Sequence, residues 1–288
     1  ALPGYENLFH LLIQEKFPLS DIIKAGLMIK SRKNGRLMDY FRNRIIFPIT
    51  NLQGKVIAFG GRVLDDQLPK YINSPETPVY SKGKNLYGLY QARNAIRQNK
   101  QVIIVEGYTD VLMAHQYGFD NVIASLGTAL TNQQAELIKR YTDEVIIAFD
   151  SDSAGKSATL RGLNILKKEG LQVKIISLPA ENDPADVILK KGKEYFTDLV
   201  KNSLPFLDYK LEVLIQRHNP LSAEGKIAII RGLFPDLIHI DSQLELQMEA
   251  KKIAEKLDVE EESMLRDLNR FRKGSRTFSN ISTNTKTE

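Results

Sequence analysis

The chain has 288 residues, of which 42% are hydrophobic and 26% are charged, and its formal net charge is +5. This composition predicts a globular protein of about two domains. No apolar run approaches the roughly 18 residues of a transmembrane helix and no signal peptide opens the chain, so we expect a cytoplasmic protein without membrane contact. Because the chain contains no cysteine, disulfides and thiolate zinc sites are excluded.

The first region, residues 1–98, mixes an opening helix with short strands such as 56–59 and with loops rich in Pro, Asn, Ser and Gly. This mixture is typical of α+β packing. Residues 1–100 contain 16 Lys or Arg and 7 Asp or Glu, a local charge of +9, which leaves −4 for the rest of the chain. Basic side chains displace counterions from phosphates, so this region predicts contact with nucleic acid. The plainer alternative is a solvated surface.

The basic residues of this region recur within strand and turn segments, with Tyr and Asn between them. Aromatic and amide side chains can stack on unpaired bases or hydrogen-bond to them. We expect Phe47, Ile49 and Phe59 in the core instead. The predicted nucleic-acid or nucleotide contacts are Arg42, Arg44, Arg62, Lys70, Tyr71, Asn73, Lys82 and Lys84, with Tyr80 among them in the sequence.

The second region, residues 99–198, alternates strand-like and helical segments, which predicts a parallel sheet with helices on its faces. Thr131 and Gln134 have the spacing of a capping box, and Gly170 is placed to end a helix. The expected strands are 102–105, 121–125, 144–149 and 172–178, and the expected helices are 109–117, 131–141 and 154–169.

Acidic clusters follow two of these strands directly: Glu106 and Asp110 come after 102–105, and Asp150 and Asp152 come after 144–149. Ligands of an open parallel sheet bind outside the carboxyl ends of its strands, so these carboxylates can converge. Oxygen ligands suit Mg²⁺, which points to phosphoryl-transfer chemistry. A single Asp could instead cap a helix, as Asp152 would before residue 154. Two clusters together favour the metal site.

From residue 199 the chain is apolar at helical spacing, which predicts a helical subdomain up to residue 273. The tail, residues 274–288, is mostly Ser, Thr, Asn and Lys and is expected to be disordered. The expected helices are 204–217, 222–234, 241–257 and 260–272.

The acidic pattern resembles the Toprim domain, a metal-binding module of bacterial primases, of type IA and type II topoisomerases and of some nucleases. Four segments before it are similar, in order and spacing, to bacterial replicative DNA primase; they are Arg42–Ile49, Gly54–Arg62, Pro69–Thr77 and Lys82–Leu89. The resemblance implies an α/β fold with a Toprim-type parallel sheet flanked by helices. A basic α+β subdomain would precede this sheet and a helical bundle would follow it.

The resemblance also implies a DNA-directed RNA polymerase that makes short RNA primers on a single-stranded DNA template from ribonucleoside triphosphates. It implies Mg²⁺ or Mn²⁺ on Glu106, Asp150 and Asp152, with Asp110 also fitting the first motif. A third acidic loop of the family matches Asp183 directly. Asp186 matches only a neighbouring position and could instead cap a helix starting at Val187.

By the same resemblance we expect a fragment that lacks two domains of the family, one that binds zinc and one that binds the replicative helicase. The helicase would then be a partner of the full-length protein only. Two alternatives stay open. One is another Toprim enzyme, a topoisomerase or nuclease fragment, and the other is a non-catalytic nucleic-acid-binding module.

Overall fold

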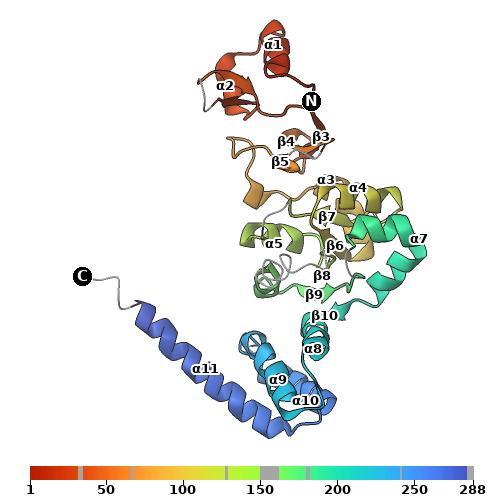
Figure 1. The fold of residues 1–288 in the computed structure, drawn as a ribbon, viewed down its shortest axis with the longest axis vertical. Helices are drawn as coiled ribbons and strands as arrows, with labels where there is room; N and C mark the ends of the chain where they lie inside the picture. Colours follow the sequence, from red (N-terminus) through yellow and green to blue (C-terminus); the bar gives the residue numbers. More distant parts are fainter. Residues whose placement is uncertain are drawn as a thin grey trace. The chain divides into compact units, whose positions relative to one another are not determined.

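The computed structural model of the chain (Figure 1) describes residues 1–31, 35–65, 68–126, 129–149, 162–179, 182–240 and 242–283. The chain divides into two compact units, Ala1–Ser203 and Leu204–Glu288. Within the described ranges, no helix combines the length and the apolar character that crossing a membrane requires.

The first unit opens with two short helices and two small antiparallel sheets. One sheet is a hairpin of β1 and β2, and the other has the strand order β3-β4-β5. The register of the second sheet places Gly60 opposite Asn73 and Arg62 opposite Tyr71. These elements are α1 (Asn7–Gln14), α2 (Leu19–Lys24), β1 (Met28–Lys30), β2 (Leu37–Asp39), β3 (Arg44–Thr50), β4 (Val56–Val63) and β5 (Tyr71–Asn73).

A parallel sheet follows, in which the strands run in the order β9-β8-β6-β7. Its strands read as continuous Val and Ile runs because both faces are covered, and residues Val102–Val105 are at most 1% exposed. The strands are β6 (Gln101–Val105), β7 (Val122–Ala124), β8 (Glu144–Ile147) and β9 (Gln172–Ile175). The four predicted strands are thereby confirmed, with β7, β8 and β9 shorter than expected.

Helices cover both faces of this sheet, as Figure 1 shows for α5 on one side and α7 on the other. Residues of α4 and α7 form one core with β6, β7 and β8. These helices are α3 (Leu89–Asn99), α4 (Tyr108–Gln116), α5 (Asn132–Lys139) and α7 (Pro184–Lys201); residues 162–168 are also helical. The α/β fold with a parallel sheet is confirmed.

Two of the predicted helix-end signals are confirmed in atomic detail. The hydroxyl of Thr131 accepts a hydrogen bond from the backbone N–H of Gln134 at 3.1 Å, and Oε1 of Gln134 accepts one from the backbone N–H of Thr131 at 3.1 Å, as a capping box requires. Gly170 has a φ of 70°, the left-handed conformation that ends helices. The predicted start of that helix, at residues 154–161, lies outside the described residues.

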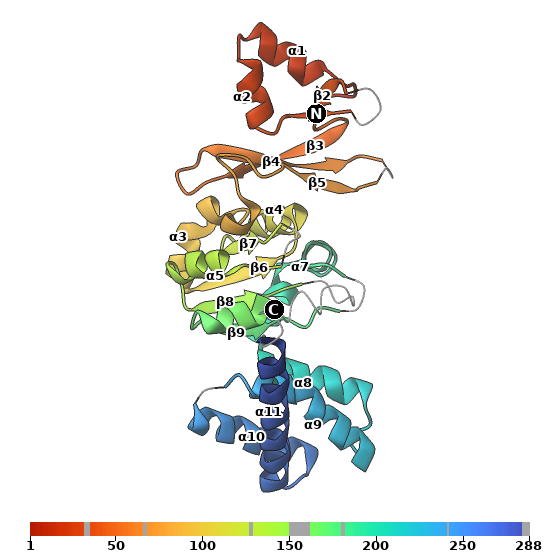
Figure 2. The same ribbon diagram turned by 90° about the vertical axis from the view of Figure 1, so that its left-hand side faces the viewer.

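The second unit starts with β10 (Leu204–Pro205) and is otherwise helical (Figure 2). Ion pairs join its helices, such as that of Lys252 Nζ with Asp208 at 2.5 Å. The four helices agree with the predicted positions; they are α8 (Phe206–Arg217), α9 (Ala223–Leu237), α10 (Gln243–Leu257) and α11 (Glu261–Thr283).

The sequence predicts a disordered tail from residue 274, whereas α11 continues through Thr283 in the structure. The segment contains no proline to stop the helix. Extending an existing helix adds one backbone hydrogen bond per residue without a new nucleation step, so weak helix formers can follow a strong start. Residues 284–288 lie outside the described part of the chain.

Candidate active site

A cleft of about 660 Å³ lies between the β4–β5 side of the first unit and the carboxyl end of β6. Predicted site residues from both sides line it. The basic sheet contributes Arg62, Lys70, Tyr71 and Asn73, and the acidic side contributes Glu106, Asp110, Asp183 and Asp186. The structure therefore brings together residues separated by more than 120 positions in the sequence.

The first acidic motif is placed by the turn from β6 into α4. Glu106 follows the last strand residue, and Gly107 is the N-cap of α4. The backbone N–H of Gly107 donates to Oδ2 of Asp110 at 3.0 Å. Asp110 is 5% exposed and lines the cleft, so it holds the turn that carries Glu106. The prediction of both residues at one strand end is confirmed in position.

The third acidic loop sits at the start of α7. Asp183 is its N-cap, and Asp183 Oδ1 accepts from the backbone N–H of Asp186 at 2.6 Å. The alternative that Asp186 caps a helix starting at Val187 is wrong, because the helix begins earlier, at Pro184, which favours the first helical position. Asp186 instead pairs with Lys190 at 2.9 Å.

The predicted ligands Asp150 and Asp152 lie outside the described residues. Among the residues that are described, no three His, Cys, Asp or Glu side chains are grouped closely enough to hold a metal ion. The cleft presents carboxylate oxygens on its acidic side. This donor set fits a hard cation such as Mg²⁺, which takes oxygen ligands and keeps several waters. The predicted set consists of Glu106 together with Asp150 and Asp152.

On the basic side, Tyr71 is available to a ligand. Its ring is 37% exposed, and the Arg62 guanidinium carbon lies 5.6 Å from the ring centroid. The Tyr71 hydroxyl lies 3.5 Å from Oγ1 of Thr109, across the cleft on α4. An exposed aromatic ring beside Arg and Lys is the arrangement that stacks on unpaired bases.

Arg44 and Arg42 have internal partners. The guanidinium of Arg44 donates to the carbonyls of Pro69 at 2.9 Å, Lys70 at 3.1 Å and Gly61 at 3.2 Å. Burial, followed by repulsion from Arg42, lowers the pKa of Arg44. Arg42 donates to the carbonyl of Asp39 and lies over the ring of Tyr5 at 5.5 Å. The structure thus uses both arginines to tie the backbone, and neither lines the cleft.

Lys82 and Lys84 lie on a 3₁₀ turn, η1 (Lys82–Lys84), that α5 holds in place. The amide of Gln134 donates to the carbonyls of Lys82 at 3.0 Å and Asn85 at 2.8 Å. The hydroxyl of Thr131 donates to the carbonyl of Gly83 at 2.6 Å. Gln134 is 0% exposed. The sequence showed only the capping box and gave no sign of this second role.

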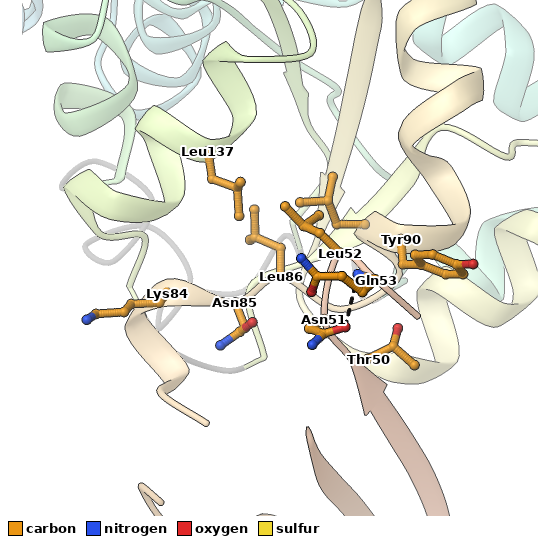
Figure 3. Close-up of a pocket in the computed structure, with 10 residues that line it drawn as sticks. Thr50, Asn51, Leu52, Gln53, Lys84, Asn85, Leu86, Tyr90 and Leu137 are labelled. Carbon is orange, nitrogen blue, oxygen red and sulfur yellow. Dashed lines mark hydrogen bonds between the residues drawn. The ribbon is translucent and has the colours of Figure 1, made fainter. Parts of the chain in front are cut away.

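Lys84 also borders a second, smaller pocket of about 230 Å³, which has no acidic residue among the described residues that line it (Figure 3). The turn between β3 and β4 forms one side of it, where Oδ1 of Asn51 accepts from the backbone N–H of Gln53 at 3.0 Å. The Tyr90 ring and Leu137 also line this pocket.

Tyr80 is a corrected expectation. It lies among the basic residues in the sequence, but it is 1% exposed and belongs to the core cluster of Phe47 and Ile49. Burial, followed by the nearby charge of Glu76, raises the pKa of Tyr80 to about 12. A buried ring cannot stack on a base. The core positions expected for Phe47 and Ile49 are confirmed.

Three family models match the chain. The DNA primase catalytic core, N-terminal domain, matches residues 1–93, and a Toprim-like model matches residues 103–188. The DnaB-helicase binding domain of primase matches residues 207–262.

Relatives agree with these matches. A DNA primase of Clostridium acetobutylicum is 45% identical over 92% of this chain, which spans 44% of that protein. The crystal structure of a DNA primase domain from Pseudomonas aeruginosa is 34% identical, with a TM-score of 0.77 over 92% of this chain and 84% of its own. A DnaG primase catalytic domain bound to ssDNA is 31% identical, with a TM-score of 0.75 over 91% of this chain and 83% of that one. The chain spans less than half the length of the curated relatives it matches.

The expectation that this chain lacks a helicase-binding domain is corrected by the third family model, which matches within the second unit. Apolar spacing shows that helices pack together, but it does not show which protein their outer surface binds. The sequence therefore predicted the four helices but not the protein that they bind in the family model.

Proposed function

We propose, because the chain belongs to the DNA primase family, that it is the catalytic core of a primase, which copies single-stranded DNA into short RNA primers. The observation that carries the proposal is the cleft itself. It brings an exposed aromatic ring and two basic side chains into one space with the acidic end of a parallel sheet. Nucleotidyl transfer needs both, since the template and nucleotide are anionic and the reaction centre needs a cation.

In this proposal Glu106, with Asp150 and Asp152, would hold Mg²⁺ or Mn²⁺, which supplies charge stabilisation at the attacking hydroxyl and the departing pyrophosphate. Asp110 keeps the Glu106 turn in place through its bond to Gly107. The remaining groups bind and orient the substrates.

Arg62 and Lys70 would bind phosphates, which sets the register of template and ribonucleoside triphosphate without reading sequence. Tyr71 would stack on a base, and Watson–Crick pairing with the template would select the nucleotide. Lys82 and Lys84, on their braced turn, would extend the phosphate contacts beyond the cleft. Arg42 and Arg44 support the shape of this surface through their backbone contacts.

The alternatives are not favoured. A topoisomerase or nuclease would share the Toprim-like region, but the first 93 residues match the catalytic core of DNA primases. A non-catalytic binding module would give no reason for four carboxylates to line one cleft, where they repel one another.

The direct test is incorporation of labelled ribonucleotides on single-stranded DNA, with and without Mg²⁺. We expect short RNA products that require template, metal and all four nucleotides. Relaxation of supercoiled DNA without primer synthesis would replace this proposal with a topoisomerase.

Lys82 and Arg44 give a paired prediction that separates phosphate contact from structural support. Lys82→Ala should weaken binding of single-stranded DNA and reduce the slope of log affinity against log salt by about 0.7, as one lost phosphate contact does. Arg44→Ala should instead lower the melting temperature, because three carbonyls lose their donor. Fluorescence titration and thermal melts measure the two effects.

The matched control for Lys82 is Lys168→Ala, an exposed lysine of the first unit that lies outside the cleft and outside the braced turn. An equal change in salt slope for Lys82→Ala and Lys168→Ala would mean that Lys82 is a solvent-exposed lysine without a specific phosphate contact.

A second function is favoured for the second unit, which matches the helicase-binding model. Leu244 and Met248 are 68% and 66% exposed and lie one turn apart on α10, opposite its buried residues. We propose that this apolar surface binds the replicative helicase. Leu244→Ser with Met248→Ser should weaken helicase binding in a pull-down, whereas the exposed neighbour variant Gln247→Ser should not. Equal helicase binding by the unaltered protein, the double variant and Gln247→Ser would contradict the proposal.

A further inference from the structure

The strongest unexplained feature is the position of Tyr108, two residues after Glu106. Its side chain is 3% exposed, and Tyr108 lies in the wall of the cleft. The ring stacks on Phe47 from β3 at 4.9 Å and meets the edge of Tyr87 at 4.7 Å. The Tyr108 hydroxyl has a hydrogen-bond partner in this apolar setting: it donates to Oδ1 of Asn73 on β5.

Both polar atoms of the Asn73 side-chain amide form hydrogen bonds within the protein. While Oδ1 accepts from Tyr108, Nδ2 donates to the carbonyl of Leu126 at 3.2 Å. Leu126 lies just beyond β7 of the parallel sheet. Asn73 was predicted to contact nucleic acid. Its observed bonds instead connect the basic strand to two segments of the parallel-sheet region.

Gly60 makes room for this connection. It pairs with Asn73 in the antiparallel sheet. A Cβ atom at Gly60 would lie 2.2 Å from Cζ of Tyr108 and 2.3 Å from its hydroxyl oxygen. Real Cβ atoms do not approach that closely. A residue without a side chain is therefore needed for the Tyr108 ring to reach Asn73.

The two ends of the Tyr108–Asn73 hydrogen bond are each two residues from a group in the cleft. Glu106 precedes Tyr108 on the acidic side, and Tyr71 precedes Asn73 on the basic side. Tyr71 pairs in register with Arg62. The Tyr108 end of the bond is 3% exposed and packed against the rings of Phe47 and Tyr87, and such a low-dielectric setting strengthens a hydrogen bond.

We infer that Tyr108 is a positioning residue whose hydroxyl, through Asn73, fixes the placement of Tyr71 and Arg62 relative to Glu106. The inference rests on the proposed function, because it matters only if one substrate touches both sides of the cleft. A triphosphate bound to the basic side must present its reacting phosphorus to the acidic side. A displacement of about 1 Å between the two sides can lower a rate by about 100-fold.

The test is Tyr108→Phe, which keeps the ring contacts and removes only the hydroxyl. We expect kcat for primer synthesis to fall by about tenfold or more, with a smaller change in KM for nucleotide. The matched control is Tyr80→Phe in the same core cluster, where among the described residues the Tyr80 hydroxyl has no hydrogen-bond partner. Tyr80→Phe should leave kcat unchanged.

A double-mutant cycle separates positioning from general support. Asn73→Ala also loses the bond to Leu126, so it should lower kcat at least as much as Tyr108→Phe does. The double variant should lose no more than Asn73→Ala alone, because that single variant already lacks the Tyr108–Asn73 bond. Losses of kcat that multiply in the double variant would overturn the inference. So would a kcat for Tyr108→Phe equal to that of Tyr80→Phe.

Hydrogen exchange keeps this test distinct from failure of the proposed function. If the unaltered protein makes no primers, the proposed function fails, but the connection can still be measured. Tyr108→Phe should then speed amide exchange in β5 and in the turn at Gly107 relative to Tyr80→Phe. Equal exchange in both variants would overturn the connection itself.

Discussion

Glu106→Gln is expected to lower metal-dependent ribonucleotide incorporation by more than about 100-fold. Loss of an outer-shell partner already costs about 10- to 100-fold at metal sites, and loss of a ligand should exceed that. The substitution preserves shape and removes the charge, so any binding of template through Arg62, Lys70 and Tyr71 should persist. Incorporation assays over a range of Mg²⁺ concentrations, with a parallel DNA-binding titration, measure both effects.

Stability gives this prediction a second readout. Glu106 shares the cleft with Asp110 and Asp183, and carboxylates without a cation between them repel one another. The melting temperature of Glu106→Gln without metal should therefore stay level or rise. The control is Glu136→Gln, the same change on the exposed face of α5, which should leave activity intact. Activity of Glu106→Gln within about twofold of the unaltered protein would remove Glu106 from the metal site.

The parallel sheet and its acidic edge were predictable because both are local patterns. A run such as Val102–Val105 has only one stable environment, the centre of a covered sheet, and the residues after it must then lie at the sheet edge. Chain order alone therefore placed Glu106 and Asp110. Asp183 was predicted from the family resemblance, and its cap to Asp186 shows a structural use of the same carboxylate.

The basic side was predicted less well, because the charge of a side chain does not indicate which group it will contact in the folded protein. Arg44 and Arg62 look equivalent in the sequence, yet Arg44 donates to three carbonyls while Arg62 lies over an exposed ring. Asn73 looked like a base contact because it follows Tyr71. Its internal bonds depend on Tyr108 and Leu126, which are 35 and 53 residues away, and no local pattern encodes such a pairing.

The second large expected effect is on stability, at the Lys82–Lys84 turn. There, the buried side-chain amide of Gln134 forms hydrogen bonds with three backbone groups. We expect Gln134→Leu to destabilise the protein by about 3 kcal/mol or more. The substitution leaves the carbonyls of Lys82 and Asn85 and the N–H of Thr131 without their partner, and each buried unsatisfied group costs about 1 to 3 kcal/mol. For a unit of this size, that corresponds to a fall in melting temperature of about 6 to 12 °C.

DNA binding by the Lys82–Lys84 turn should weaken when the Gln134 hydrogen bonds are lost. If Gln134 holds Lys82 and Lys84 where they meet phosphates, Gln134→Leu should also weaken binding of single-stranded DNA at temperatures where the protein is still folded. The neighbouring variant Gln133→Leu makes the same change at an exposed position of α5 and should alter neither property. Thermal melts and DNA titrations on both variants decide the matter. Lost stability with unchanged DNA affinity would mean that the turn is braced for folding alone, and equal melting of the two variants would mean that the Gln134 hydrogen bonds do not support it.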